Sequence, residues 1–172
     1  MIKYENEIKM KHLYILRHAK TNQFSPTGKD FDRELMEKGV KQLVELGTYF
    51  QKKVDSSGLV CFISAAKRTQ QTWMGIKHFV RYINETSLHS LYHANRQELL
   101  DFIWEQKTES DMLLIGHNFG ISDLASYFLD EEIVLSTSEL IQLSFDCDQW
   151  NETSQGMATL TARFRPLVDA VD

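Results

Sequence analysis

The sequence has little of several features, and each scarcity argues against a class of protein. Two prolines and no low-complexity run among 172 residues leave little room for a linker or a disordered tail. No apolar run is long enough to span a membrane, and the charged N-terminus lacks the apolar core of a signal peptide. We therefore expect a cytoplasmic protein that has no membrane partner.

Positive charge and cysteine are also scarce. The net charge of -5 argues against a nucleic-acid binder that works through a large basic surface. Cys61 and Cys147 lie far apart in apolar segments, which is typical of reduced core residues rather than of a disulfide or a metal site. The length favours one domain, and we expect it to cover residues 11–172, after a polar extension over residues 1–10.

Apolar patterns along the chain predict alternating strands and helices. Short apolar runs at residues 13–16, 59–63 and 112–115 predict buried strands. Helical spacing of apolar residues follows each run, and we expect helices over residues 35–54, up to about residue 83, from residue 95 and after residue 118. Asn95 and Glu98 have the spacing of a capping box, whereas residues 84–94 show no clear pattern.

The C-terminal part changes character. Residues 139–145 and 158–164 alternate apolar with polar side chains, which favours strands at the sheet edge, joined as a hairpin. The order of elements predicts an α/β protein. We expect a single three-layer α/β/α domain with a mainly parallel central sheet and antiparallel edge strands.

Three of the predicted strands end in polar residues, and the carboxyl ends of parallel strands lie on one side of a sheet. Two arginines and two histidines can therefore converge on one pocket, with few carboxylates nearby, which suits a phosphoryl group. The residues at these strand ends are Arg17 and His18, then Ser64 and Arg68, then His117 and Asn118.

The residue types alone leave alternatives open for the histidines. His18 could be a nucleophile, a general base or a metal ligand. His89 and His93 have the spacing of a helical zinc pair, but no HExxH motif accompanies them. We therefore expect no metal and no cofactor.

Five segments carry a resemblance to a known family: LYILRHAKT, DFDRELMEKGVKQ, SAAKRTQQTW, LYHANRQELLDFI and LLIGHNFGISDLA. In order and spacing they resemble the histidine phosphatase superfamily, and most of all its short SixA-type phosphohistidine phosphatase branch. The resemblance runs from about residue 11 to residue 145 and implies a phosphoglycerate mutase-like fold.

The resemblance implies a role for each residue at the strand ends. His18 would be the nucleophile that is transiently phosphorylated, and Arg17, Arg68 and His117 would hold the phosphoryl oxygens. Nearby cations should lower the pKa of His18, and a carboxylate or backbone carbonyl should hold its other ring nitrogen. Further contacts to the phosphoryl group would come from Arg33, Asn118, Ser64 and Thr21.

The general acid of larger relatives has no clear match, because the equivalent region offers only Glu85 and Glu98. An imidazole leaves readily when protonated, so a missing acid favours phosphohistidine or another activated phosphate. We expect a metal-independent phosphatase (a hydrolase) whose partner is a phosphorylated protein, such as a histidine phosphotransfer domain, or a small phosphorylated metabolite.

Two other functions fit the same residues. One is a small-molecule phosphomonoesterase of the same superfamily, whereas a mutase is less favoured because the chain lacks sugar-recognising insertions. The other is a non-catalytic module that binds the phosphate of a phosphorylated partner. His18 argues against this module, because binding alone requires no nucleophile.

Overall fold

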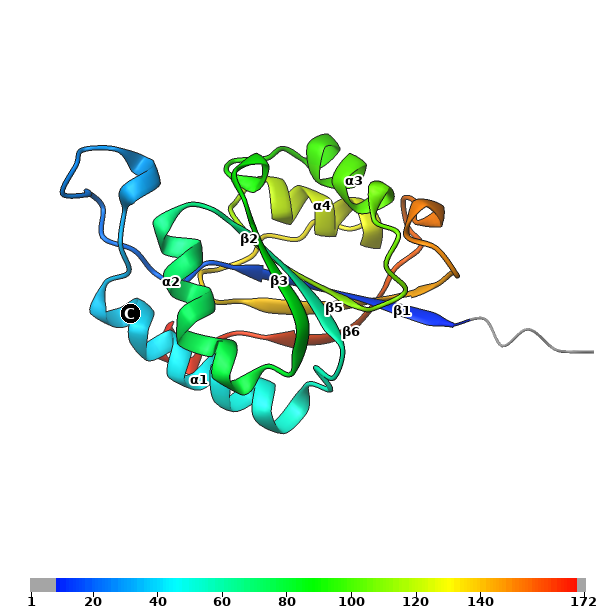
Figure 1. The fold of residues 1–172 in the computed structure, drawn as a ribbon, viewed down its shortest axis with the longest axis horizontal. Helices are drawn as coiled ribbons and strands as arrows, with labels where there is room; N and C mark the ends of the chain where they lie inside the picture. The colour runs from blue at the N-terminus through cyan, green and yellow to red at the C-terminus, as the bar shows by residue number, and fades with distance from the viewer. Residues whose placement is uncertain (1–8, 170–172) are drawn as a thin grey trace, which may run out of the picture.

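One six-stranded sheet organises the chain, in the strand order β3-β2-β4-β1-β5-β6 (Figure 1). The computed structural model describes residues 9–169. The first four strands run parallel, and the last two are antiparallel to their neighbours. The α/β fold with a mainly parallel sheet is therefore confirmed. The strands are β1 (Met10–Arg17), β2 (Leu59–Ser64), β3 (Tyr82–Leu88), β4 (Met112–Gly116), β5 (Leu140–Asp146) and β6 (Thr159–Phe164).

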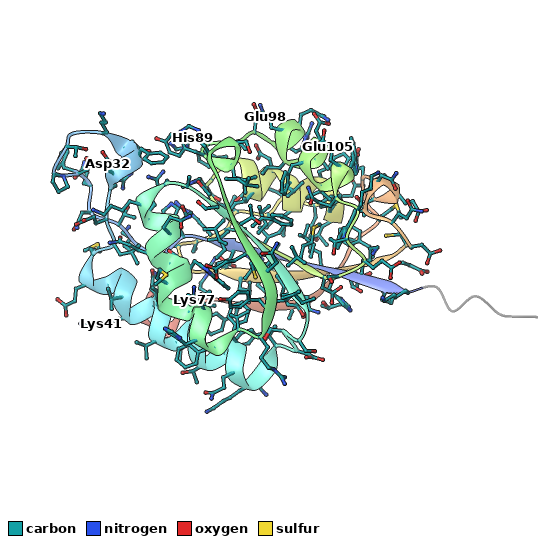
Figure 2. All side chains as sticks on the ribbon, viewed as in Figure 1. Asp32, Lys41, Lys77, His89, Glu98 and Glu105 are labelled. Atoms are coloured by element: carbon teal, nitrogen blue, oxygen red, sulfur yellow. The ribbon has the colours of Figure 1, made fainter. Side chains whose placement is uncertain are left out.

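Helices cover both faces of the sheet (Figure 1). The helices α1 (Glu37–Lys53) and α2 (Lys67–Ile76) pack on one face, and α3 (Arg96–Glu105) and α4 (Gly120–Leu129) pack on the other. Side chains fill the space between the sheet and the helices on each of its two faces (Figure 2). Short 3-10 turns are η1 (Asp30–Asp32), η2 (Lys77–Phe79), η3 (His89–Leu91), η4 (Trp150–Glu152) and η5 (Leu167–Asp169).

The sequence of β1 explains how one strand serves two cores. Leu13 and Ile15 pack in the apolar cluster beneath α3 and α4, whereas Tyr14 and Leu16 pack in the cluster beneath α1 and α2. Successive side chains of a strand point to opposite faces, so a strand covered on both faces needs apolar residues at every position. This is why β1 reads as an unbroken apolar run from Leu13 to Leu16, just before Arg17.

The structure differs from the predicted elements at the β3 edge of the sheet. The helix expected to reach residue 83 ends at Ile76. The segment without a clear pattern, residues 84–94, contains most of β3 and all of η3. Because β3 is an edge strand with mostly exposed side chains, it has no apolar run to reveal it. The two alternating segments form β5 and β6, the antiparallel pair expected at one edge of the sheet, with β6 as the outermost strand. The pairing of β5 with β6 confirms the hairpin.

The capping box at the start of α3 is confirmed. The Asn95 side chain accepts from the Glu98 backbone at 3.0 Å, and the Glu98 carboxylate accepts from the Asn95 backbone at 2.8 Å. Figure 2 labels Glu98, in the first turn of α3, and Glu105, at the other end of the same helix. The capping box satisfies two otherwise unpaired donors, so the Glu98 carboxylate stabilises the helix start.

Three further predictions concern the chain as a whole. Cys61 and Cys147 are both buried and free, and their expected place in the core is confirmed. Within residues 9–169, no helix combines the length and the apolar character needed to cross a bilayer. Most of the extension predicted over residues 1–10 lies outside the described residues, and Met10 is the first residue of β1.

Candidate active site

A small pocket of about 210 Å³ lies where β1 and β4 end and α2 begins. Seven of the eight predicted site residues line it, since the carboxyl ends of parallel strands meet there. The eighth, Ser64, contacts His117 instead of lining the pocket. The lining residues are Arg17, His18, Lys20, Thr21, Asp30, Arg33, Arg68, His93, His117, Asn118 and Thr137.

His18 follows β1 directly and is only 7 % exposed. Its Nδ1 lies 2.8 Å from the carbonyl oxygen of Ala19, which can only accept a hydrogen bond. The ring therefore carries its proton on Nδ1, and Nε2 keeps a free lone pair. The backbone carbonyl expected from the sequence is thus the partner of the second ring nitrogen.

Burial is the main reason why His18 stays neutral. It lowers the pKa of His18 to about 3, and the charges of Arg68 and Arg17 act in the same direction, while the bond to Ala19 opposes them. The sequence predicted this direction from the cations alone, which contribute less than burial. A neutral imidazole with a free Nε2 is the nucleophilic form of histidine.

His117 follows β4 and packs beside His18, with the ring centroids 5.3 Å apart. Its Nε2 lies 2.7 Å from the Ser64 hydroxyl, and its Nδ1 is buried with no partner among residues 9–169. Burial, followed by His18 and Arg68, lowers the pKa of His117 to about 2. A neutral ring offers one N–H donor, so His117 can contribute a hydrogen bond to a bound anion but no full charge.

Two guanidinium groups at the pocket, that of the partly buried Arg17 and that of the buried Arg68, each keep an unused donor. Arg17 donates from Nη1 to the Leu135 carbonyl at 2.8 Å, and Arg68, 2 % exposed, donates to the backbone and side chain of Asp30. The Nε of each arginine is buried and finds no partner in the described part of the chain. An unpaired buried donor costs roughly 1–3 kcal/mol, which an anion accepting from it would recover.

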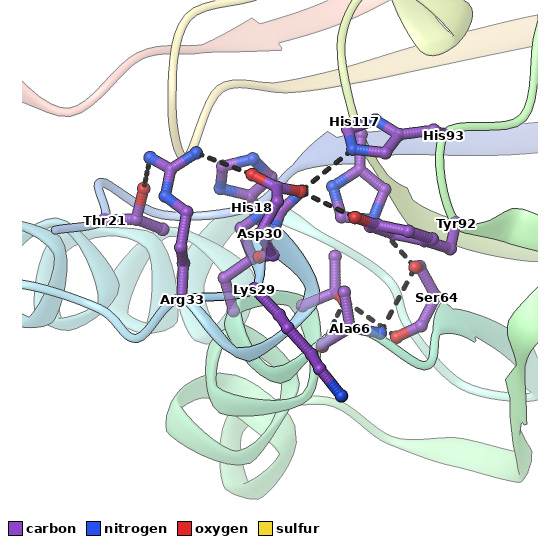
Figure 3. A network of polar contacts seen from close by, with 12 residues as sticks. His18, Thr21, Lys29, Asp30, Arg33, Ser64, Ala66, Tyr92, His93 and His117 are labelled. Atoms are coloured by element: carbon purple, nitrogen blue, oxygen red, sulfur yellow. Dashed lines mark hydrogen bonds and ion pairs between the residues drawn. The ribbon is translucent and has the colours of Figure 1, made fainter. Parts of the chain in front are cut away.

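Asp30 is a functional candidate that the sequence reasoning missed. Its carboxylate accepts hydrogen bonds from Arg33, Tyr92 and His93, as Figure 3 shows, and also from Arg68, all within 3.0 Å. Burial opposes ionisation, but the bonds from Tyr92, Arg33 and His93 outweigh it and hold the pKa of Asp30 well below its ordinary value. These donors come from three separate segments of the chain, and only the segment DFDR, shared with the family pattern, could have indicated the residue.

His93 also reaches the pocket, whereas His89 does not form a pair with it. The His93 ring donates to Asp30 at 2.9 Å, and the His89 ring stacks on Phe31 at 5.4 Å. Among residues 9–169, no three His, Cys, Asp or Glu side chains gather in a way that could hold a metal ion.

The two glutamates considered as general acids both lie elsewhere. Glu85 accepts from the Trp73 indole at 2.8 Å and from Lys77 at 3.1 Å, and Glu98 caps α3. Neither glutamate lines the pocket.

The fold and the pocket define an α/β protein with a buried, neutral histidine and two arginines at the carboxyl edge of its sheet. Residues 13–91 match the model of the histidine phosphatase superfamily (branch 1). Over these residues the resemblance to the superfamily found in the sequence is confirmed, and the fold is phosphoglycerate mutase-like. No curated protein sequence matches the chain.

Solved structures with the same fold cover nearly the whole chain. A SixA protein from Nakamurella multipartitia superposes with a TM-score of 0.79 at 20 % identity, covering 92 % of this chain and 98 % of its own. The protein histidine phosphatase SixA complexed with tungstate gives 0.72 at 16 %, covering 90 % and 97 %. A mycobacterial glucosyl-3-phosphoglycerate phosphatase gives 0.58 at 14 %, covering 90 % and 98 %.

Proposed function

We propose that the protein is a metal-independent phosphohistidine phosphatase that forms a covalent phosphohistidine on His18. The observation that carries the proposal is the pairing of a buried imidazole, whose Nε2 is free, with the unused buried donors of Arg17 and Arg68 in one pocket. A nucleophile beside donors that match phosphoryl oxygens is the arrangement that phosphoryl transfer requires.

The first step transfers the phosphoryl group to the enzyme. The Nε2 lone pair of His18 attacks phosphorus in line, and the bond between phosphorus and the substrate nitrogen breaks. The electron pair of that bond returns to the substrate imidazole, which leaves neutral because its other nitrogen is protonated. The bond from Nδ1 to Ala19 keeps the His18 ring oriented and supports the positive charge that it gains.

The second step regenerates the enzyme. Water attacks phosphorus, the bond to Nε2 breaks, and its electron pair returns to His18, which is neutral again. The phosphate leaves as the dihydrogen form, with both protons of the attacking water. In each step Arg17, Arg68 and the N–H of His117 would stabilise the equatorial oxygens as charge spreads over them.

The size of the pocket favours a protein-borne substrate. Pockets that enclose a small molecule usually have about 300–1,000 Å³, and this pocket has about 210 Å³. It accommodates a phosphoryl group on the end of a side chain more readily than a whole metabolite. A phosphorylated protein, such as a histidine phosphotransfer domain, is therefore the partner that we favour, in a cytoplasmic setting.

Substrate preference tests this proposal. After dialysis against EDTA, the protein should still hydrolyse phosphohistidine in a peptide. Glycerol phosphate should react about 10²–10⁴-fold more slowly, because the carboxyl group that lines the pocket, that of Asp30, is ionised and cannot protonate an alkoxide leaving group. Glu85→Gln and Glu98→Gln serve as matched controls and should keep this preference.

Three results would contradict the proposal. Comparable turnover of glycerol phosphate would point to a small-molecule phosphomonoesterase. Binding of a phosphorylated partner without any hydrolysis would point to a phosphate-binding module. Loss of activity in EDTA that zinc or magnesium restores would remove the metal-independent mechanism.

A further inference from the structure

We propose that Asp30 makes the site selective for phosphohistidine, by accepting a hydrogen bond from the imidazole that leaves. This inference rests on the proposed function. It concerns the leaving group of the substrate, whereas the role proposed for His18 is to receive the phosphoryl group. It assigns a role to a carboxylate that the phosphoryl chemistry does not require.

Asp30 stands at the mouth of the pocket. Its side chain is 41 % exposed and lines the same cavity as His18, which is buried at 7 % exposure. In-line attack directs the leaving group away from the nucleophile, and therefore from the buried His18 toward the half-exposed mouth. The leaving group thus approaches Asp30.

The carboxylate is ionised and held in place by its neighbours. Arg33 donates to Oδ1 at 3.0 Å, and Tyr92 and Arg68 donate to Oδ2 at 2.7 and 3.0 Å (Figure 3). Arg68 also donates to the Asp30 backbone carbonyl at 2.8 Å, so the position of the loop does not depend on the carboxylate alone. A negative charge is thereby held in place at a pocket whose other charged lining residues are cationic.

The imidazole ring of His93 already forms a hydrogen bond to this carboxylate. The Nε2 of His93 lies 2.9 Å from Oδ2 of Asp30, and the His93 ring lies 5.3 Å from that of His117 (Figure 3). His93 has a left-handed backbone, with φ of 53°, which costs a non-glycine residue energy and therefore needs local support. Its side chain is 51 % exposed, so a substrate imidazole can displace it. His93 shows the position that the leaving ring would take.

The carboxylate separates the two substrate classes by charge. While it is still bonded to phosphorus, the substrate imidazole carries a proton on its second ring nitrogen and a positive charge. Asp30 accepts a hydrogen bond from this N–H and stabilises the charge. The bridging oxygen of a phosphate ester offers no such proton, and the ester dianion is repelled by Asp30. Asp30 therefore favours P–N over P–O cleavage without donating a proton.

Asp30→Asn tests the role of the charge. Asparagine keeps the shape and one acceptor oxygen for Arg68 but removes the negative charge. We expect kcat/KM for a phosphohistidine peptide to fall by about 10- to 100-fold, the loss typical of a hydrogen bond to a charged group. The value for p-nitrophenyl phosphate should not fall. Asp32→Asn is the matched control, because Asp32 lies in the same turn and accepts from Thr27 at 2.6 Å instead. It should leave both values unchanged.

Two outcomes would overturn the inference. Equal losses on both substrates would make Asp30 a positioning residue for Arg68, and no loss on either would leave it without a role. His93→Ala adds an independent arm and should raise kcat/KM for phosphohistidine, because His93 then no longer competes with the substrate imidazole for Oδ2 of Asp30. A fall would contradict the inference and assign the contact to His93. Labelling of His18 by p-nitrophenyl phosphate in Asp30→Asn keeps the proposed function separate, since it should persist whether or not Asp30 selects the substrate.

Discussion

Arg68→Ala is expected to lower turnover by about 10³-fold or more, because an arginine that stabilises a transferring phosphoryl group is typically worth ~10³–10⁵ in kcat. Arg68 lies in the first turn of α2, directly at the pocket, and its buried Nε is free of partners within residues 9–169. Steady-state kinetics on phosphohistidine peptide would measure the loss.

The same substitution should change stability far less than activity. The charged partner of Arg68 is Asp30, which is half-exposed and can be solvated when the guanidinium is removed. Lys67→Ala is the matched control, since Lys67 is the neighbouring residue of α2 and pairs with Glu34 outside the pocket. It should leave kcat unchanged. Parallel losses of kcat and of the denaturation midpoint in Arg68→Ala would make Arg68 a structural residue.

Acid is expected to destabilise the fold through its two buried histidines. His18 and His117 have folded pKa values of about 3 and about 2, below the ordinary value of ~6.5 in an unfolded chain. Between the folded and the unfolded pKa values, the unfolded chain binds more protons than the folded protein does. The contribution of the two histidines to the free energy of unfolding is therefore complete above pH ~6.5 and falls as the pH drops toward ~3. From pH 7 to pH 5 the two residues together would cost at most about 4 kcal/mol.

Urea unfolding at pH 7 and pH 5 measures this cost. His117→Gln removes one of the two titrating rings, so it should lose about half as much stability over that interval as the unsubstituted protein, whatever its stability at pH 7. His78→Gln, at an exposed position, should keep the full loss. An unchanged pH dependence in His117→Gln would show that this ring is not held neutral by the fold.

The sequence predicts the parts of this protein that depend on local apolar patterns. The runs that form β1, β2 and β4 are unbroken because both faces of each strand are covered, and the polar residues after them mark the site. Their convergence on one pocket follows from parallel pairing, which the alternation of strands and helices already indicates.

The rest depends on contacts between distant segments, which no local pattern encodes. The edge strand β3 is mostly exposed and so lacks an apolar run. Asp30 lies in the 3-10 turn η1 and His93 in a loop, 63 positions apart, and they matter because both line the same pocket. Val40 and Val44 are exposed on α1 although they are apolar, so the helical spacing of apolar residues does not by itself show which of them are buried.

The most direct test of the account is the covalent intermediate on His18. After incubation with an activated phosphate donor and a rapid quench, ³¹P NMR and peptide mapping should find a phosphoryl group that is acid-labile, base-stable and attached to His18. His18→Ala should carry none, whereas Lys67→Ala should carry as much as the unsubstituted protein. A phosphoryl adduct that persists in His18→Ala, or phosphohistidine turnover by that variant, would contradict the assignment of His18 as the nucleophile.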